Sequence, residues 1–140
     1  MEDRRFGNVV LVEGKNRGRY PFANSLLIDD RVRAVVDPAA GRKKMQEVKD
    51  RGEIDIVLNT HYHEDHVTYN YMFPEAEVYF HEMDRRGFES LEGQFEMGIG
   101  ELLSPSLRDE YEMLYTERFH FLGWRGARLL RDGDELEFGD

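Results

Sequence analysis

The chain has 140 residues, of which 29 are acidic and 19 basic, so its formal net charge is −10. This surplus of negative charge disfavours a nonspecific grip on DNA, RNA or anionic membranes, which needs a local excess of Lys and Arg. The one basic run, residues 42–44, is expected on a surface helix. Because the chain has no cysteine, disulfides and thiolate metal sites are excluded.

Neither a secretory signal nor a membrane span is predicted. The charged N-terminus has no apolar run behind it, and no stretch approaches the roughly 18 consecutive apolar residues of a membrane helix. We therefore expect a cytoplasmic protein with no membrane partner and no nucleic-acid partner.

The predicted elements alternate between strands and helices, which is the order of an α/β sheet with helices packed on it. Strands are predicted at residues 8–13, 25–28, 32–36, 54–58 and 77–80, and helices at 38–51 and, for one or two turns, 67–73. In the longer helix Met45 and Val48 face inward, and Gly52 lies just past its end. Residues 129–140 are predicted as a hairpin that turns at Asp132-Gly133, with a calcium loop as the alternative.

Residues 84–123 are predicted as a helical insertion rich in aromatic residues and methionine. Ser104-Pro105 marks a helix start, after which four side chains fall on one face: Leu107, Tyr111, Leu114 and Tyr115. The preceding apolar residues are Phe88, Leu91, Phe95, Met97, Ile99, Leu102 and Leu103, interrupted by Gly93, Gly98 and Gly100. The spacing favours a core or a dimer interface; a lid over a site is the alternative.

Residues 60–66, Thr-His-Tyr-His-Glu-Asp-His, carry the strongest chemical signal. Three of the five histidines fall in six consecutive positions, where a random spread would place about 0.2. In extended backbone His61 and His63 lie on one side, about 6.6 Å apart, so both can lean onto one ion. Asp65 and His66 follow after the chain turns and can reach a second ion. Imidazole and carboxylate are the usual ligands of zinc and of catalytic iron or manganese.

The motif lies where a predicted strand gives way to a helix, at the sheet edge where α/β proteins build their sites. Three further residues are candidates for contact with the metal or with its ligands. Asp37 ends a strand and can either accept a hydrogen bond from a ligand imidazole or serve only as a turn residue. His81 follows the strand at 77–80 and can lie near the metal, whereas His120 lies in an aromatic run where packing is favoured over ligation.

The motif resembles the signature of the metallo-β-lactamase superfamily. The run His61-x-His63-x-Asp65-His66 follows an apolar strand, as it does in that family. Residues 24–28 resemble the family's second strand, and residues 34–37 resemble the strand that ends in a supporting aspartate. The intervening positions Tyr62 and Glu64 vary in the family, and Glu64 is expected to face solvent. The resemblance covers about residues 8–84 and 127–140.

The resemblance implies an α/β fold, namely the N-terminal half of an αβ/βα sandwich with a mixed sheet and helices packed on it. Residues 1–140 would then form a partial domain of this type. In the family, later ligands come from the second half: a histidine in a Gly-His segment, a bridging aspartate and a final histidine. None is visible in this sequence. Half a sandwich leaves an apolar face open, so either a homodimer or poor solubility is expected.

The resemblance and the motif together predict metal-assisted hydrolysis of an ester, thioester, lactone or similar small-molecule substrate. One or two Zn²⁺ ions, with Fe or Mn as alternatives, would be held by His61 and His63 and by Asp65 and His66. Asp65 is also the candidate catalytic residue, placed to take a proton from water. Two other classes stay open. One is an iron-dependent redox enzyme of the same fold, an oxygenase or oxygen reductase. The other is a non-catalytic fragment without the full ligand set.

Overall fold

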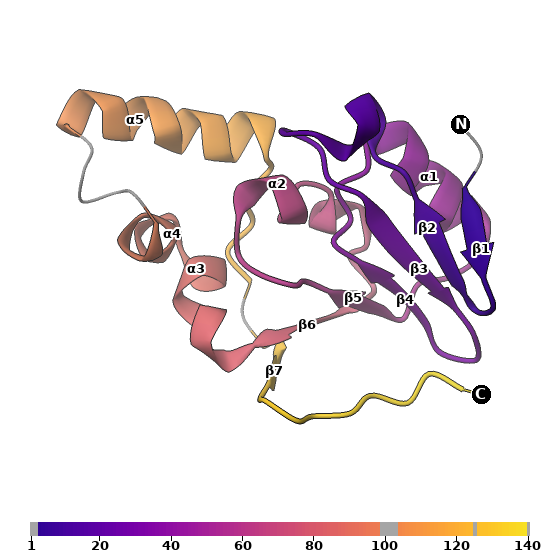
Figure 1. Cartoon of the computed structure of the whole chain (residues 1–140). Helices are drawn as coiled ribbons and strands as arrows, with labels where there is room; N and C mark the ends of the chain where they lie inside the picture. Colours follow the sequence, from indigo (N-terminus) through magenta and orange to yellow (C-terminus); the bar gives the residue numbers. More distant parts are fainter. Residues whose placement is uncertain (1–2, 99–103, 125, 140) are drawn as a thin grey trace.

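The structure, a computed structural model, describes residues 3–98, 104–124 and 126–139. Within these residues a seven-stranded mixed sheet has its strands in chain order from one edge to the other (Figure 1). Strands β1 to β4 pair antiparallel, whereas β4 to β7 run parallel. The strands are β1 (Arg4–Phe6), β2 (Val9–Val12), β3 (Ser25–Asp29), β4 (Arg33–Val36), β5 (Ile56–Leu58), β6 (Glu77–His81) and β7 (Arg128–Leu130). The predicted α/β class with a mixed sheet is confirmed.

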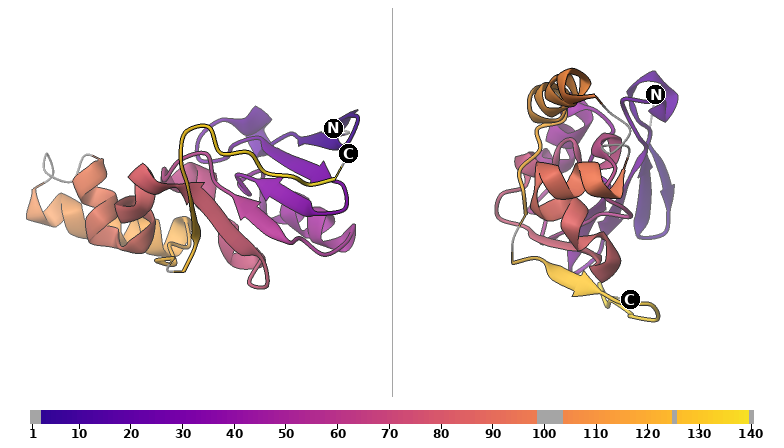
Figure 2. Two further views of the ribbon diagram at one scale, coloured as in Figure 1. Left: turned by 90° about the horizontal axis from the view of Figure 1, so that it is seen from below. Right: turned by 90° about the vertical axis from the view of Figure 1, so that its left-hand side faces the viewer.

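Helices cover one face of the sheet and extend beyond one end of it (Figures 1 and 2). The helical segments are η1 (Lys15–Gly18), α1 (Arg42–Asp50), α2 (Glu64–Val67), η2 (Asn70–Met72), η3 (Glu82–Asp84), α3 (Arg85–Glu89), α4 (Leu91–Met97), α5 (Pro105–Met113) and the π-helical η5 (Leu114–Arg118). No helix in the described ranges is long and apolar enough to cross a membrane.

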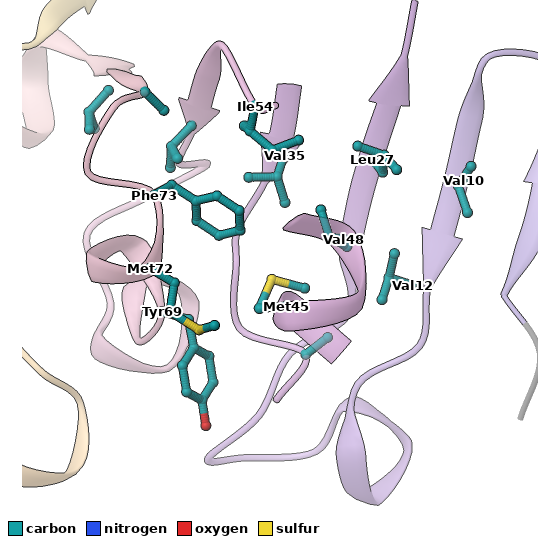
Figure 3. Close-up of a cluster of buried hydrophobic side chains, with 14 of the residues drawn as sticks. Val10, Val12, Leu27, Val35, Met45, Val48, Ile54, Tyr69, Met72 and Phe73 are labelled. Carbon is teal, nitrogen blue, oxygen red and sulfur yellow. The ribbon is translucent and has the colours of Figure 1, made fainter. Parts of the chain in front are cut away.

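The main core lies between the sheet and α1. Side chains alternate along the strands, so strands β2 to β6 each place an apolar set on the helical face. Figure 3 shows Val10, Leu27 and Val35 pointing toward Met45 and Val48 of α1. Met45 and Val48 are buried, as the helical spacing predicts. The remaining strand residues of this core are Val12, Val57, Val78 and Phe80.

Helix α1 begins at Arg42, so the prediction of a helix from residue 38 was wrong. Carbonyl groups before Arg42 are already bonded to other segments: those of Pro38, Ala39 and Ala40 accept from the backbone N–H groups of Tyr69, Ala23 and Lys15. A carbonyl bound in this way cannot enter the helical ladder. Gly41, with φ of 128°, then turns the chain into the helix. Long-range backbone bonds thus shorten the helix at its N-terminus.

The second face of the sheet carries the C-terminal segment rather than the predicted hairpin. Strand β7 pairs parallel with β6, and the chain turns at Gly133, with φ of 86°. Residues 135–139 contain no strand. Phe138 accepts a hydrogen bond from Val32 through its carbonyl and, with Leu136, packs on Ala34, Ile56 and Tyr79. The hairpin prediction was wrong because apolar burial on the sheet face directs this segment.

Strand β1 was not predicted from the sequence. It pairs antiparallel with β2 through a turn at Gly7, where φ is 60°. All three of its residues are exposed, so no buried apolar alternation marks it. The strand forms because the outer edge of β2 presents backbone N–H and C=O groups, which pair with those of β1.

The helical insertion builds a small core of its own. Phe95, Tyr115 and Phe119 are buried together, with Leu91, Tyr111 and Phe121 packed against them. Phe88 of α3 instead stacks on Phe80 of β6, with ring centroids 3.9 Å apart, which joins the insertion to the sheet. Leu107 and Leu114 of the predicted helical face are exposed at 45% and 37%. The core interpretation is therefore confirmed for half of that face, while Ile99, Gly100, Leu102 and Leu103 lie outside the described residues.

Neighbouring leucines on β3 test which face of the sheet carries the stabilising core. Leu27 is fully buried under α1, so Leu27→Ala should lower the free energy of unfolding by about 3 kcal/mol. Leu26, on the opposite face, is 37% exposed, and Leu26→Ala should cost about 1 kcal/mol or less. Urea unfolding followed by circular dichroism measures both. Equal losses would contradict the assignment of the core to the helical face.

Candidate metal centre

The parallel pairing of β4 and β5 brings Asp37 next to the histidine motif. Val36 is in register with Leu58, and the N–H of Asp37 donates to the Leu58 carbonyl at 2.9 Å. Parallel neighbours end at the same edge of a sheet, so Asp37 and Thr60 emerge side by side. The motif then runs through α2, where His66 turns back toward Asp37.

The carboxylate of Asp37 accepts three hydrogen bonds while only 5% exposed. Its Oδ1 accepts from the N–H of Thr60 at 2.8 Å. Its Oδ2 accepts from the Thr60 hydroxyl at 2.6 Å and lies 2.9 Å from Nδ1 of His66. The backbone of Asp37 adopts φ of 48°, in the left-handed region that costs an ordinary residue of order 1 kcal/mol. A conformation of that cost, held by buried hydrogen bonds, is typical of functional sites.

These contacts set the tautomers of two histidines. An ionised carboxylate only accepts, so Nδ1 of His66 must carry the proton that faces Asp37. The single Thr60 hydroxyl proton goes to Asp37, so the 2.9 Å contact between Thr60 Oγ1 and His61 Nδ1 requires His61 to donate. In both rings Nε2 is then left with a free lone pair. One buried carboxylate therefore prepares two imidazoles to bind a cation through Nε2.

The four predicted ligands lie within one small region. The ring of His61 is 4.7 Å from that of His63 and 4.2 Å from that of His66, measured between centroids. Oδ2 of Asp65 is 3.7 Å from Nε2 of His66. Two ligands on one tetrahedral zinc ion are separated by roughly 3.3 Å, from bonds of about 2.0 Å, so this pair is near ligand spacing.

A tighter group of possible ligand atoms includes Asp37. One atom each from Asp37, His61 and His66 lies within 4.8 Å of the other two, whereas His63 and Asp65 are outside this group. His63 is the most exposed of the motif histidines. Imidazole nitrogen and carboxylate oxygen together suit zinc, iron or manganese, so the donor set fits a divalent ion of this class.

The electrostatic environment treats His61 and His66 differently. Burial lowers the pKa of His61, with a further contribution from the neighbouring His66 and His63 rings. The hydrogen bond to Asp37 raises the pKa of His66, against the opposing effect of burial. Asp37 opposes the lowering at His61 but dominates at His66, since only His66 contacts the carboxylate directly.

The helical insertion braces the motif through Tyr62. The Tyr62 carbonyl accepts from Nε2 of Gln94 at 3.1 Å, and its hydroxyl donates to the Met97 carbonyl at 2.9 Å. Gly87 of α3 lies so close to the Tyr62 ring that a Cβ there would be 2.7 Å from it. Tyr62 is therefore a packing residue that fixes the loop against α3 and α4.

Glu64 is half-buried rather than facing solvent, so that expectation was wrong. Its Oε1 accepts from the Tyr20 hydroxyl at 3.2 Å, a contact from a segment 44 residues away. Burial, together with this carboxylate, raises the pKa of Tyr20. A long-range partner of this kind leaves no signal in the motif itself.

The other two histidines are engaged away from the motif. Nε2 of His81 lies 2.9 Å from Oδ1 of Asp132, and its Nδ1 accepts from the N–H of Met83 at 3.2 Å. His120 packs on the rings of Tyr71 and Tyr69, at 4.6 and 6.4 Å between centroids. Burial lowers the pKa of His120. The packed interpretation of His120 agrees with these contacts.

Sequence reasoning missed the polar residues that hold the loop. Asn59 and Asn70 are buried and donate to each other at 3.2 and 2.8 Å, which ties the end of β5 to η2. The hydroxyl of Ser25 donates to the Asp37 carbonyl at 2.5 Å and accepts from Ala39. The only local signal was the position of Asn59 at the end of an apolar strand.

The metallo-beta-lactamase superfamily model matches residues 18–129, which include the whole site described above. This chain belongs to the metallo-beta-lactamase superfamily. A search of curated proteins finds no match.

Solved structures support the same fold at low sequence identity. A beta-lactamase domain protein from Burkholderia ambifaria is 18% identical with a TM-score of 0.65, and the match covers 99% of this chain and 45% of that one. A metallo-beta-lactamase family protein from Thermus thermophilus is 19% identical, with a TM-score of 0.63 and coverage of 96% and 49%. The hydrolase AbOPH of the beta-lactamase superfamily is 16% identical, with a TM-score of 0.51 and coverage of 96% and 62%. The chain thus spans about half the length of the first two.

In chelator-treated protein the pKa values of His66 and His61 should be shifted in opposite directions from the ordinary histidine value. His66 should lose its proton above the ordinary histidine pKa of about 6.5, and His61 below it. The His66 interaction then stabilises the fold below pH of about 6.5 and is lost as pH rises through the raised pKa. Asp37→Asn should lower the pKa of His66 toward its ordinary value.

Two-dimensional NMR of the imidazole protons measures these pKa values. Asp132→Asn is the matched control, because Asp132 contacts His81 and no residue of the motif. A His66 pKa that is unchanged in Asp37→Asn would contradict the role given to the carboxylate.

Proposed function

We propose that this chain supplies the metal-binding half of a metal-dependent hydrolase that acts on a small-molecule substrate. The observation that carries the proposal is the pair of imidazoles oriented by one buried carboxylate. A hydrogen-bond network that presents two Nε2 lone pairs is costly to build and serves no evident packing purpose. Superfamily membership supports metal-dependent hydrolysis as the reaction type.

In this proposal His61, His63, Asp65 and His66 hold one or two ions, with zinc as the first expectation and iron or manganese as alternatives. When bound, such an ion supplies acidity that makes water a nucleophile at neutral pH. Asp37 acts through His66 and Thr60 and is a positioning residue. Its hydrogen bonds prevent the two imidazoles from rotating away from a common point.

Asp65 is the candidate for moving a proton at the reacting water. Its carboxylate is half-buried at the start of α2 and lies 3.7 Å from Nε2 of His66. In contrast to Asp37, it accepts no hydrogen bond from another described residue that would occupy its oxygens. A carboxylate with free lone pairs beside the imidazoles can accept a proton or orient a water molecule.

The substrate class proposed is an ester, thioester, lactone or related small molecule. The exposed position of His63 leaves one side of the histidine group open to solvent. A reacting molecule needs such an opening, since a catalytic metal site keeps a position free for water or substrate.

Metal content measures the first step of this proposal. Protein is supplied with Zn²⁺ and then dialysed against a weak chelator. It should retain about one ion or more per chain, as measured by mass spectrometry of the metal. His61→Ala should weaken the affinity for the ion by a factor of about ten or more, because a ligand is removed. His81→Gln is the matched control and should retain the ion, since His81 is bonded to Asp132.

Hydrolysis of a panel of ester, thioester and lactone substrates tests the second step. In the complete enzyme, Asp65→Ala should reduce the rate by about 100-fold or more while the circular dichroism spectrum is unchanged. A near-full rate in Asp65→Ala would contradict its catalytic role. An empty site in wild-type protein would favour a non-catalytic fragment, and iron retained in place of zinc would favour the redox alternative.

A further inference from the structure

A cleft of about 670 Å³ opens at the N-terminus of α1, away from the histidine motif. Its walls come from the segment around η1, from the start of α1, and from η5. Its lining contains six cationic side chains, Lys15, Arg17, Arg42, Lys43, Lys44 and Arg118, and one carboxylate, Glu13. This concentration of positive charge stands in a chain whose net charge is −10.

The first turn of α1 is electrostatically unfavourable as it stands. Arg42, Lys43 and Lys44 occupy this turn, which contains no acidic residue, and Gly41 provides no side-chain cap. The N-terminus of a helix carries partial positive charge and unpaired N–H groups, so three cations there repel it and each other. A negatively charged group bound at this turn would remove the conflict.

Tertiary structure adds further cations from distant segments. Phe22 has the ammonium of Lys15 at 5.6 Å and the guanidinium of Arg118 at 5.4 Å from its ring centroid. The segment that follows η1 lies against the end of η5, since the ring centroids of Tyr20 and Phe119 are 5.8 Å apart. One ring thus gathers two like charges that are 103 positions apart in the sequence.

Most of these cations lack a compensating carboxylate. Lys44 pairs with Asp3 at 3.1 Å. Within residues 3–98, 104–124 and 126–139, the other five make no ion pair. The lining also contains apolar or small residues, among them Phe22, Ala40, Gly41 and Tyr69. Figure 3 shows the Tyr69 hydroxyl directed away from Met72 and Phe73, out of the core.

We propose that this cleft binds a small organic phosphate. The phosphate groups would lie at the first turn of α1, between its N–H groups and the side chains of Arg42 and Lys43, with Arg118 opposite. The organic part would contact the apolar lining residues Phe22 and Tyr69. A cleft of this volume suits a small molecule, whereas the net charge of −10 disfavours binding of a long polyanion such as a strand of nucleic acid.

The site is distinct from the metal centre. None of its lining residues belongs to the 60–66 motif. The lining residue nearest to Asp37 in the sequence is Ala40, three positions later. Binding here requires no metal, so it can be tested in metal-free protein. Failure of this inference would leave the proposed hydrolysis untouched, and the reverse also holds.

Isothermal titration calorimetry of chelator-treated protein with inorganic pyrophosphate and with ADP tests the proposal. Both probes should bind, and Arg42→Gln with Lys43→Gln in one variant should weaken binding about tenfold for each charge-assisted hydrogen bond that is removed. Arg118→Gln, on a separate segment, should weaken it about tenfold as well. Lys49→Gln is the matched control, because Lys49 lies at the other end of α1 and outside the cleft.

A second readout separates a loss of binding from a loss of folding. The double variant should melt at a higher temperature than the wild-type protein without ligand, because two cations are removed from the helix N-terminus. Absence of binding of either probe, binding that the double variant leaves unchanged, or a lower melting temperature of that variant would each overturn the proposal.

Discussion

Burying a carboxylate is costly unless its lone pairs are used, and Asp37 uses them to fix the metal loop. Its oxygens accept from the N–H and hydroxyl of Thr60 and from Nδ1 of His66. Thr60 in turn accepts from His61. The end of β4, the end of β5 and helix α2 are thereby tied at one point. Rotation of His66 would break a charge-assisted hydrogen bond to Asp37, and rotation of His61 would break its bond to the Thr60 hydroxyl, which Asp37 holds in place. The orientation of both rings therefore depends, directly or through Thr60, on this one side chain.

The loop is also held from its other side. Tyr62 contacts Gly87 of α3 and is hydrogen-bonded to Gln94 and Met97 of α4. The insertion can do this because its own aromatic core keeps its helices together and Phe88 stacks on β6. The motif therefore lies between a rigid sheet edge and a rigid helical layer, which favours a preformed site over one assembled on binding.

Charge is distributed unevenly over the molecule, and net charge conceals this. The overall value of −10 argues against binding to polyanions, yet the fold collects six cations around the start of α1. The basic run 42–44 was visible in the sequence as a surface feature. Its partners Lys15, Arg17 and Arg118 were not, because they come from distant segments; Lys15 and Arg118 meet over the ring of Phe22. Local composition and tertiary placement thus lead to different expectations about small anionic ligands.

The sequence by itself determined the strands of the sheet centre, the buried face of α1 and the cluster of histidines. These depend on apolar periodicity and on neighbouring residues, which are local properties. The start of α1, strand β1 and the C-terminal segment were decided only by tertiary structure. Distant N–H groups bind the carbonyls before α1, β2 pairs with β1, and burial on the sheet directs the C-terminal segment. The same holds for Asp37: its place at a strand end was readable, but its bond to His66 depends on the parallel register of β4 and β5.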